Sequence, residues 1–171
     1  MWRIDRVADK IKRGDISIGT HSMFGWGGGM LTELYGTVGF DMVWIDTEHG
    51  AIDKSTLMNM LIGCAVNNMA AFVRVAWNDK VLAKPILDMG ADGIIFPMVL
   101  DAEQARAAVA ACQYPPDGVR GWGPVRNMKY GAVGLDAYKE QAKKVWTVIQ
   151  IEDIRAVENI DSILAVEGLN A

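Results

Sequence analysis

The sequence has 171 residues, of which 51% are hydrophobic and 22% are charged, an ordinary composition for one globular domain. The formal net charge of −4 and the lack of a basic stripe argue against binding to nucleic acid or anionic lipid. The charged N-terminus does not resemble a signal peptide and no apolar run reaches membrane-spanning length, so a cytoplasmic protein without a membrane partner is expected.

The chain opens with a predicted helix and a short predicted strand. Apolar residues at helical spacing predict a helix over residues 2–13, which Gly14 ends. A strand is predicted at residues 16–20, followed by a glycine-rich turn at residues 24–29. The helix after this turn is expected to bury its apolar residues, which are Leu31, Leu34, Tyr35 and Val38.

The glycine-rich turn fits neither the GxGxxG spacing of a dinucleotide site nor the lysine pattern of a P-loop. We favour close approach of two backbones as the reason for its glycines. A border of a ligand site remains the alternative.

The second predicted strand carries the first candidate site. Its apolar run, residues 42–45, has no polar alternation and predicts a strand that is buried on both faces. The run ends in Asp46, Thr47, Glu48 and His49. Ionisable side chains at the end of a buried strand are typical of an α/β active site, and His49 is the natural centre of acid–base chemistry near neutral pH.

The middle of the chain continues the alternation of helices and strands. Asp53 or Ser55 is predicted to cap a helix that contains Cys64. A strand is predicted at residues 70–75, interrupted by Arg74, and the segment that follows predicts a helix over residues 79–88. Asn78 or Asp79 is its expected cap, and Pro85 should kink this helix or start a second segment.

The last part of the chain holds two more predicted strands and an irregular segment. A strand is predicted at residues 93–96, and a capping-box variant at residues 101–104 predicts a helix that contains Cys112. We interpret Cys64 and Cys112 as small buried hydrophobic residues in a reducing compartment. The irregular segment, residues 113–134, is long enough that a functional role is expected.

The C-terminal part completes the pattern. A weak helix is predicted at residues 135–144, a fifth strand at 145–151 and a last helix from Asp153, whose apolar side would be Ile154, Val157, Ile160 and Leu164. Residues 168–171 have the pattern of a sixth strand. Alternating strands and helices predict a parallel α/β fold, and both a TIM barrel and an open doubly wound sheet fit.

Polar side chains gather at the predicted strand ends. They are His21, Asp46, Glu48, His49, Arg74, Gln150 and Glu152. This set suits proton transfer beside a carboxylate or carbonyl, and its oxygen ligands suit a hard divalent metal.

Each of these residues also has a structural interpretation. Arg74 could be an ion-pair partner of Asp46 or Glu48, and Glu152 could stabilise the start of the last helix. On pattern alone Asp88 is expected to be solvated, and His21 is expected to form a pocket wall rather than to react.

Four segments resemble one known family. In chain order they are VWIDTEH (43–49), VRVAWND (73–79), YPPDGVRGWG (114–123) and VIQIE (148–152). Their order and spacing resemble the HpcH/HpaI aldolases, metal-dependent class II pyruvate aldolases with a (β/α)8 TIM barrel. The resemblance runs from about residue 17 to the end of the chain, and it implies one partial barrel domain, 1–171, with five to six βα units.

The resemblance implies a role for each matched residue at the metal and the pyruvate. Glu152 would be a carboxylate ligand of a divalent ion, Mg²⁺, Mn²⁺ or Co²⁺, and Gln150 would lie beside it near the pyruvate. Arg74 would hold the keto oxygen of pyruvate and stabilise the enolate.

The resemblance also implies the acid–base residues. His49 would exchange a proton with the aldol hydroxyl, and Asp88 would orient His49, which reverses the solvated interpretation of Asp88 given above. Asp46 would lie beside the site, and His21 would line the aldehyde pocket and bind substrate.

The family barrel has eight strands, and its second metal carboxylate follows the sixth strand. The chain stops at the start of that strand, so we expect the second ligand beyond Ala171 and interpret the 171 residues as a fragment with impaired activity. The two open sheet edges predict association, and a homo-oligomer is expected of a full-length chain.

The implied reaction is cleavage of a 4-hydroxy-2-oxo acid, of the 2-keto-3-deoxy acid type, into pyruvate and an aldehyde. The alternatives are a citrate-lyase β-like reaction on the same scaffold and a non-catalytic truncated subunit.

Overall fold

The computed structural model describes residues 3–171, and the chain divides into two compact units between Val73 and Arg74. Helices alternate with five strands along the chain, as the sequence pattern predicts. Within residues 3–171, every helix is too short or too polar to cross a lipid bilayer.

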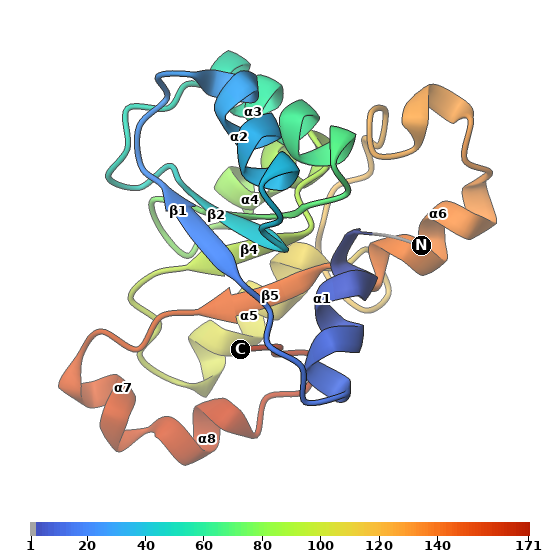
Figure 1. Cartoon of the computed structure of the whole chain (residues 1–171). Helices are drawn as coiled ribbons and strands as arrows, with labels where there is room; N and C mark the ends of the chain where they lie inside the picture. Colours follow the sequence, from blue (N-terminus) through green and yellow to red (C-terminus); the bar gives the residue numbers. More distant parts are fainter. Residues whose placement is uncertain (1–2) are drawn as a thin grey trace. The chain divides into compact units, whose positions relative to one another are not determined.

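The first unit is built on parallel strands with helices between them (Figure 1). Its elements are α1 (Arg3–Lys12), β1 (Gly19–Ser22), α2 (Gly28–Thr37), β2 (Met42–Asp46), α3 (Lys54–Val66) and β3 (Ala70–Arg74), whose last residue lies past the boundary. β1 pairs with β2 in parallel, with Gly19 opposite Met42. β3 begins beside β2, because the Ala70 N–H donates to the Asp41 carbonyl oxygen at 2.9 Å.

Helix α1 is held by two buried side chains and by one buried carboxylate. Ile4 and Val7 are its buried residues. The Asp41 carboxylate, only 1% exposed, accepts from the Lys10 ammonium at 2.8 Å and lies 2.8 Å from a nitrogen of Arg6. The predicted start of this helix at residue 2 lies outside the described residues.

Strand β1 begins three residues later than the sequence pattern predicts. Ile16 and Ile18 are exposed, and the Ile18 N–H donates to the Asp41 side chain at 2.9 Å instead of joining the sheet. His21 therefore lies within β1 and not after it.

Strand β2 is less buried than its apolar run predicts. Val43 and Ile45 are fully buried, whereas Met42 and Trp44 on the other face are only half-buried. The expectation of a strand buried on both faces is therefore wrong, and the continuous apolar run hides an alternation in burial.

Helix α2 faces α3 with its small residues, and the predicted apolar face is wrong. Leu34 and Val38 are more than half exposed, while Thr32 is fully buried and donates its hydroxyl to the Met60 carbonyl oxygen at 2.8 Å. A Cβ on Gly63 of α3 would overlap the Gly29 carbonyl oxygen, so the two helices lie backbone against backbone (Figure 1). This close approach confirms the favoured interpretation of the last glycine of the turn.

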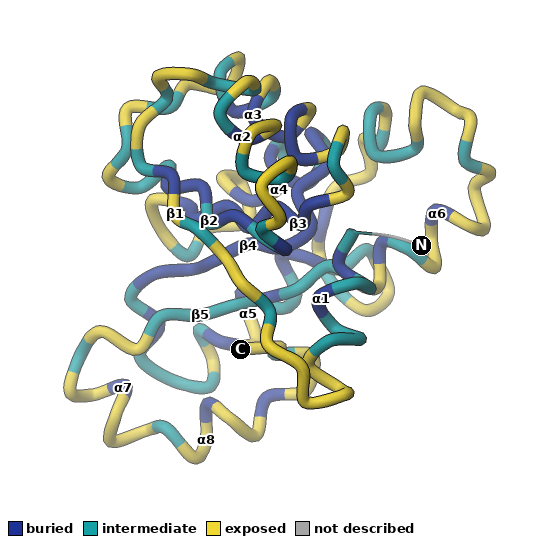
Figure 2. The backbone as a smooth tube through the Cα atoms, in the orientation of Figure 1, coloured by how far each residue is buried: buried dark blue, intermediate teal, exposed yellow. Residues whose placement is uncertain are grey.

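The second unit contains the remaining two strands and five α-helices of the described chain. Its elements are α4 (Lys80–Asp88), β4 (Gly93–Phe96), α5 (Ala102–Cys112), the short 3-10 helix η1 (Lys129–Gly131), α6 (Leu135–Ala142), β5 (Trp146–Ile149), α7 (Ile154–Glu158) and α8 (Ile160–Leu164). β4 pairs with β5 in parallel, with Gly93 opposite Trp146. All four residues of β4 are buried, as Figure 2 shows in dark blue.

Helix starts follow the predicted caps. The side chains of Asp53, Asp79 and Asp101 accept backbone N–H groups from Thr56, Val81 and Gln104 respectively. Pro85 lies inside the single helix α4, so the alternative of a second segment is wrong.

The last predicted helix is two short helices separated at Asn159. The Asn159 side chain donates to the Leu100 carbonyl oxygen at 3.0 Å, and Ala156 and Ile163 are the buried residues. Ile154, Val157 and Leu164 are exposed, so the predicted apolar face is wrong. Figure 2 shows much of α7 and α8 in the yellow of exposed residues. The break at Asn159 interrupts the helix, so residues at 3.6-residue spacing on its two sides no longer share one face.

The chain ends against β5. The Asn170 N–H donates to the Thr147 carbonyl oxygen and the Ile149 N–H donates to the Ala171 carbonyl oxygen, both at 3.0 Å. These residues are not assigned as a strand, but they bond to the β5 backbone as the predicted start of a sixth strand would.

Neither cysteine forms a disulfide bond, and both are buried, which confirms the prediction for their burial. Burial raises the pKa of the Cys112 thiol to about 11, against smaller opposing effects of a hydrogen bond with Thr147 and of the Arg120 charge. A thiol with such a pKa is unreactive near neutral pH.

Candidate active site

Asp46 organises the turn that follows β2. Its side chain is fully buried, and its Oδ1 accepts the backbone N–H groups of Glu48 at 3.0 Å and His49 at 3.2 Å. An aspartate that bonds to the backbone two and three residues ahead stabilises a tight turn. The sequence predicts a residue beside the site here, and the structure gives Asp46 the task of holding the backbone of His49.

Both histidines of the chain lie near Asp46, His49 within the turn and His21 on β1. The His49 side chain is 62% exposed, and its Nε2 lies 3.8 Å from Glu48 Oε1. His21 Nε2 lies 3.8 Å from Asp46 Oδ2, and its ring meets Trp44 edge to face at 5.6 Å between centroids. An exposed imidazole such as His49 is free to meet a small molecule.

Three of the predicted site residues form a row in the second unit. Arg74, at the end of β3, donates from Nη1 to Gln150 Oε1 at 3.3 Å, and Gln150 Nε2 donates to Glu152 Oε1 at 3.2 Å. The Gln150 N–H bonds to the Phe96 carbonyl oxygen at 2.9 Å, which continues the pairing of β5 with β4 by one residue. Arg74 is only 8% exposed, so its guanidinium is partly desolvated beside an amide.

Glu152 fits the role of one metal ligand. It is exposed, and each of its oxygens accepts one hydrogen bond, Oε1 from Gln150 and Oε2 from the Met98 N–H at 3.1 Å. Because a carboxylate oxygen has two lone pairs, each keeps capacity for a cation. Within residues 3–171, no three His, Cys, Asp or Glu side chains gather closely enough to hold a metal ion by themselves.

Glu152 is not the cap of the last helices. Asp153 takes that position, and its side chain accepts the Arg155 N–H at 2.9 Å. Hydrogen bonds from the Arg155 side chain and backbone lower the pKa of Asp153 to about 2. The side-chain hydrogen bond that caps α7 therefore comes from Asp153 and not from Glu152.

Asp88, the last residue of α4, meets a residue that sequence reasoning missed. Arg120 Nη2 donates to Asp88 Oδ1 at 2.9 Å, and the Arg120 side chain is 1% exposed while that of Asp88 is 25% exposed. Arg120 lies in the YPPDGVRGWG motif. The length of the irregular segment around this motif and its glycines were the features of the sequence that could have indicated a functional residue here. The expectation from pattern alone, a solvated Asp88, is wrong.

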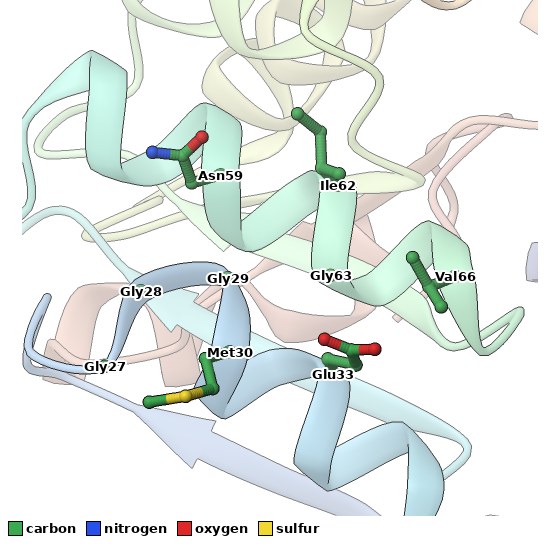
Figure 3. A pocket seen from close by; sticks show the side chains of 9 residues that line it. All are labelled: Gly27, Gly28, Gly29, Met30, Glu33, Asn59, Ile62, Gly63 and Val66. Carbon is green, nitrogen blue, oxygen red and sulfur yellow. The ribbon is translucent and has the colours of Figure 1, made fainter.

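The glycine-rich turn also borders a pocket of about 450 Å³ between α2 and α3 (Figure 3). Its lining includes Gly27, Gly28, Met30, Glu33 and Asn59. Glu33 is the one ionisable side chain in this lining, so the pocket has no group for acid–base chemistry beyond a single carboxylate.

Comparison with known proteins identifies the family. The HpcH/HpaI aldolase/citrate lyase family matches residues 29–171. A 2-dehydro-3,6-dideoxy-6-sulfogluconate aldolase of Pseudomonas putida is 41% identical over 141 residues, which cover 81% of this chain. The chain spans about half the length of this relative, 54%.

Solved structures agree over almost the whole chain. The HpcH/HpaI aldolase of Desulfitobacterium hafniense is 29% identical with a TM-score of 0.87, covering 96% of this chain and 64% of that one. The citrate synthase SbnG is 31% identical with a TM-score of 0.80, covering 95% of this chain and 62% of that one. The α/β fold is thus that of the TIM-barrel aldolases, and the chain belongs to the HpcH/HpaI aldolase/citrate lyase family.

Proposed function

We propose that this chain carries the residues of a metal-dependent aldolase that cleaves a 4-hydroxy-2-oxo acid into pyruvate and an aldehyde. The row of Arg74, Gln150 and Glu152 is the observation that supports it best. It sets a cationic group, an amide and an exposed carboxylate side by side at the ends of β3 and β5. The similarity to the Pseudomonas putida relative, a 2-dehydro-3,6-dideoxy-6-sulfogluconate aldolase, supports the same substrate class.

A divalent cation such as Mg²⁺, Mn²⁺ or Co²⁺ would supply Lewis acidity toward the 2-oxo acid, and Glu152 is the residue that would hold it. Arg74 would donate to the oxygen on which charge develops as the carbon–carbon bond breaks. A guanidinium suits this task because it cannot lose its proton near neutral pH.

His49 would take the proton of the C4 hydroxyl in the cleavage direction. The bond between C3 and C4 then breaks, C4 leaves as the aldehyde, and the electron pair forms the enolate of pyruvate beside Arg74. A proton added at C3 completes pyruvate. Asp46 would fix the backbone of His49, Asp88 would orient its ring, and His21 would line the aldehyde pocket.

The test is pyruvate release from a 4-hydroxy-2-oxo acid, followed with lactate dehydrogenase in the presence of Mn²⁺. We expect slow, metal-dependent release by the wild-type chain, as a fragment with impaired activity would show, and a further loss of about 10²-fold or more in Arg74→Met and Glu152→Gln. Glu158→Gln, a substitution of an exposed glutamate in α7, is the matched control and should keep the wild-type rate. Release that is indifferent to Mn²⁺ and to Glu152→Gln would refute the proposal.

A citrate-forming or citrate-cleaving reaction is the second candidate, and the likeness to the citrate synthase SbnG favours it. Both reactions make or break a carbon–carbon bond of a 2-oxo acid. Arg74, Gln150 and Glu152 could therefore bind the 2-oxo acid in either reaction. Turnover that requires coenzyme A or an acyl donor would favour this candidate over the aldolase.

A further inference from the structure

We infer that Arg120 is a positioning residue of the proposed reaction, and that the loop that carries it fixes Asp88 for its task. This inference rests on the proposed function. The Arg120 loop is defined here as residues 113–128, the segment between α5 and η1, and it contains the YPPDGVRGWG motif to which the proposed function gives no task.

The Arg120 loop holds the end of α4 at three consecutive residues. Arg120 donates to the Asp88 carboxylate at 2.9 Å, and Asn127 Nδ2 donates to the Leu87 carbonyl oxygen at 3.1 Å. Arg126 donates to the Met89 carbonyl oxygen. The last carbonyls of a helix have no partner within the helix, so loop donors fix this end in place.

A sharp turn presents Arg120 to α4. The Val119 N–H bonds to the Ala110 carbonyl oxygen at 2.8 Å and the Arg120 N–H bonds to the Gln113 carbonyl oxygen at 2.9 Å. A Cβ on Gly118 would overlap both of these carbonyl oxygens, so only glycine fits there. The loop thus folds back on α5 and sets the backbone of Arg120 at a fixed place.

The guanidinium of Arg120 is enclosed by aromatic rings. Its Cζ lies 4.4 Å from the centre of the Tyr114 ring, and Nη2 also reaches the Tyr138 hydroxyl at 3.4 Å. The Tyr114 and Tyr138 hydroxyls are 2.9 Å apart, and burial raises the pKa of Tyr114. A cation so enclosed is costly without a counterion, and Asp88 is the carboxylate to which Arg120 bonds.

The geometry leaves one oxygen of Asp88 for another donor. Oδ1 is bound by Arg120, while Oδ2 lies beside the backbone of Gly123, where a Cβ would come within 3.2 Å of it. A carboxylate with one oxygen fixed by a permanent cation and the other open is suited to orient an imidazole N–H. A structural ion pair that only anchors the loop is the competing explanation.

Two reactions of one enzyme separate these explanations. Aldol cleavage requires proton transfer from the C4 hydroxyl, in which Asp88 would act through His49. Decarboxylation of oxaloacetate breaks the bond between C3 and C4 with loss of CO₂ and forms the same pyruvate enolate, but no hydroxyl proton moves. A residue that positions Asp88 affects the first reaction, whereas a residue that only keeps the fold affects both.

The experiment compares kcat and KM for both reactions in the wild-type chain and in Arg120→Gln, Arg120→Lys and Gly123→Ala, with Mn²⁺ present. For Arg120→Gln we expect aldol cleavage to fall by about 10- to 100-fold in kcat with little change in KM, and decarboxylation to stay within about twofold. Arg120→Lys should retain part of the activity that Arg120→Gln loses, because lysine keeps the positive charge but lacks the planar guanidinium with its several N–H donors. Gly123→Ala, which crowds Oδ2 and leaves Arg120 intact, should show the same selective loss.

Each variant has a matched control. Arg13→Gln breaks an arginine–aspartate pair, with Asp15 at 2.8 Å, in which both side chains are exposed. Gly134→Ala adds a Cβ where no atom lies within 4 Å. Both controls should keep both activities, and circular dichroism is used to choose a temperature at which every variant is folded.

The outcomes separate this inference from the proposed function. Equal losses in both reactions, or full aldol activity in Arg120→Gln and Gly123→Ala, would overturn the inference and leave the proposed function intact. A wild-type chain that catalyses neither reaction would overturn the proposed function, and with it the role of Arg120.

Discussion

Asp41 shows how a single buried carboxylate stabilises the first unit. Burial alone would raise its pKa, but hydrogen bonds from Lys10 and from the Ile18 N–H, with the charges of Lys10 and Arg6, outweigh burial and lower the pKa below its ordinary value. A carboxyl group whose pKa is lower in the folded chain than in the unfolded chain stabilises the fold above its ordinary pKa, and that stabilisation is lost as the pH falls through the folded value.

We therefore predict that Asp41→Asn lowers the free energy of unfolding at pH 7 by about 2 kcal/mol, because charge-assisted hydrogen bonds are lost. The difference from the wild-type chain should shrink below about pH 4, as the wild-type carboxyl itself takes up a proton. Urea denaturation at a series of pH values measures both effects. Asp15→Asn, at an exposed pair, is the control, and a difference that does not change with pH would contradict the electrostatic explanation.

Residues of the candidate site divide into those that the sequence predicts well and those that it cannot predict. Gln150 and Glu152 lie at the end of the predicted fifth strand and Arg74 at the end of the predicted third, so the βα pattern places all three at strand ends. The hydrogen bonds of Gln150 with Arg74 and with Glu152 show that they are neighbours. Arg120 lies in an irregular loop, where no periodicity relates it to Asp88 across 32 residues. Only the fold of the loop reveals that pair.

At the scale of elements, the sequence predicts strand bounds and helix caps better than it predicts which side of a helix is buried. Strand β4 has the predicted bounds, and Asp53, Asp79 and Asp101 are caps, because a cap is a contact within three residues. The predicted buried face of α2 is wrong because the helix packs through Gly29 and Thr32. Apolar periodicity does not detect a contact that is made by the backbone and small residues.

The α2–α3 contact gives a prediction at this scale. Gly63→Ala should destabilise the chain by about 2 kcal/mol, because a Cβ there would overlap the Gly29 carbonyl oxygen and crowd the Thr32 hydroxyl. In an uncrowded helix the same change would stabilise, since alanine is the better helix former. Urea denaturation measures the sign, and Gly134→Ala, at the N-cap of α6, is the control for an added methyl group that meets no other atom. A stabilised Gly63→Ala would show that the helices are not in close contact.

At the scale of the whole molecule, the alternation of strands and helices predicts the α/β class, which is confirmed, and the family resemblance selects the TIM-barrel type. The choice between a barrel and an open sheet did not follow from periodicity, because both architectures repeat the same βα unit. The central claim remains that residues from separate βα units serve one cation and one substrate.

Paramagnetic broadening by Mn²⁺ tests this claim most directly, because the chain has only two histidines. In a chain with ¹³C-labelled histidine, we predict that added Mn²⁺ broadens the ring signals of His49, assigned with a His21→Gln variant. Glu152→Gln should abolish the broadening, and Glu158→Gln should retain it. Ring signals of His49 that stay sharp while Mn²⁺ binds, or broadening that persists in Glu152→Gln, would contradict the claim.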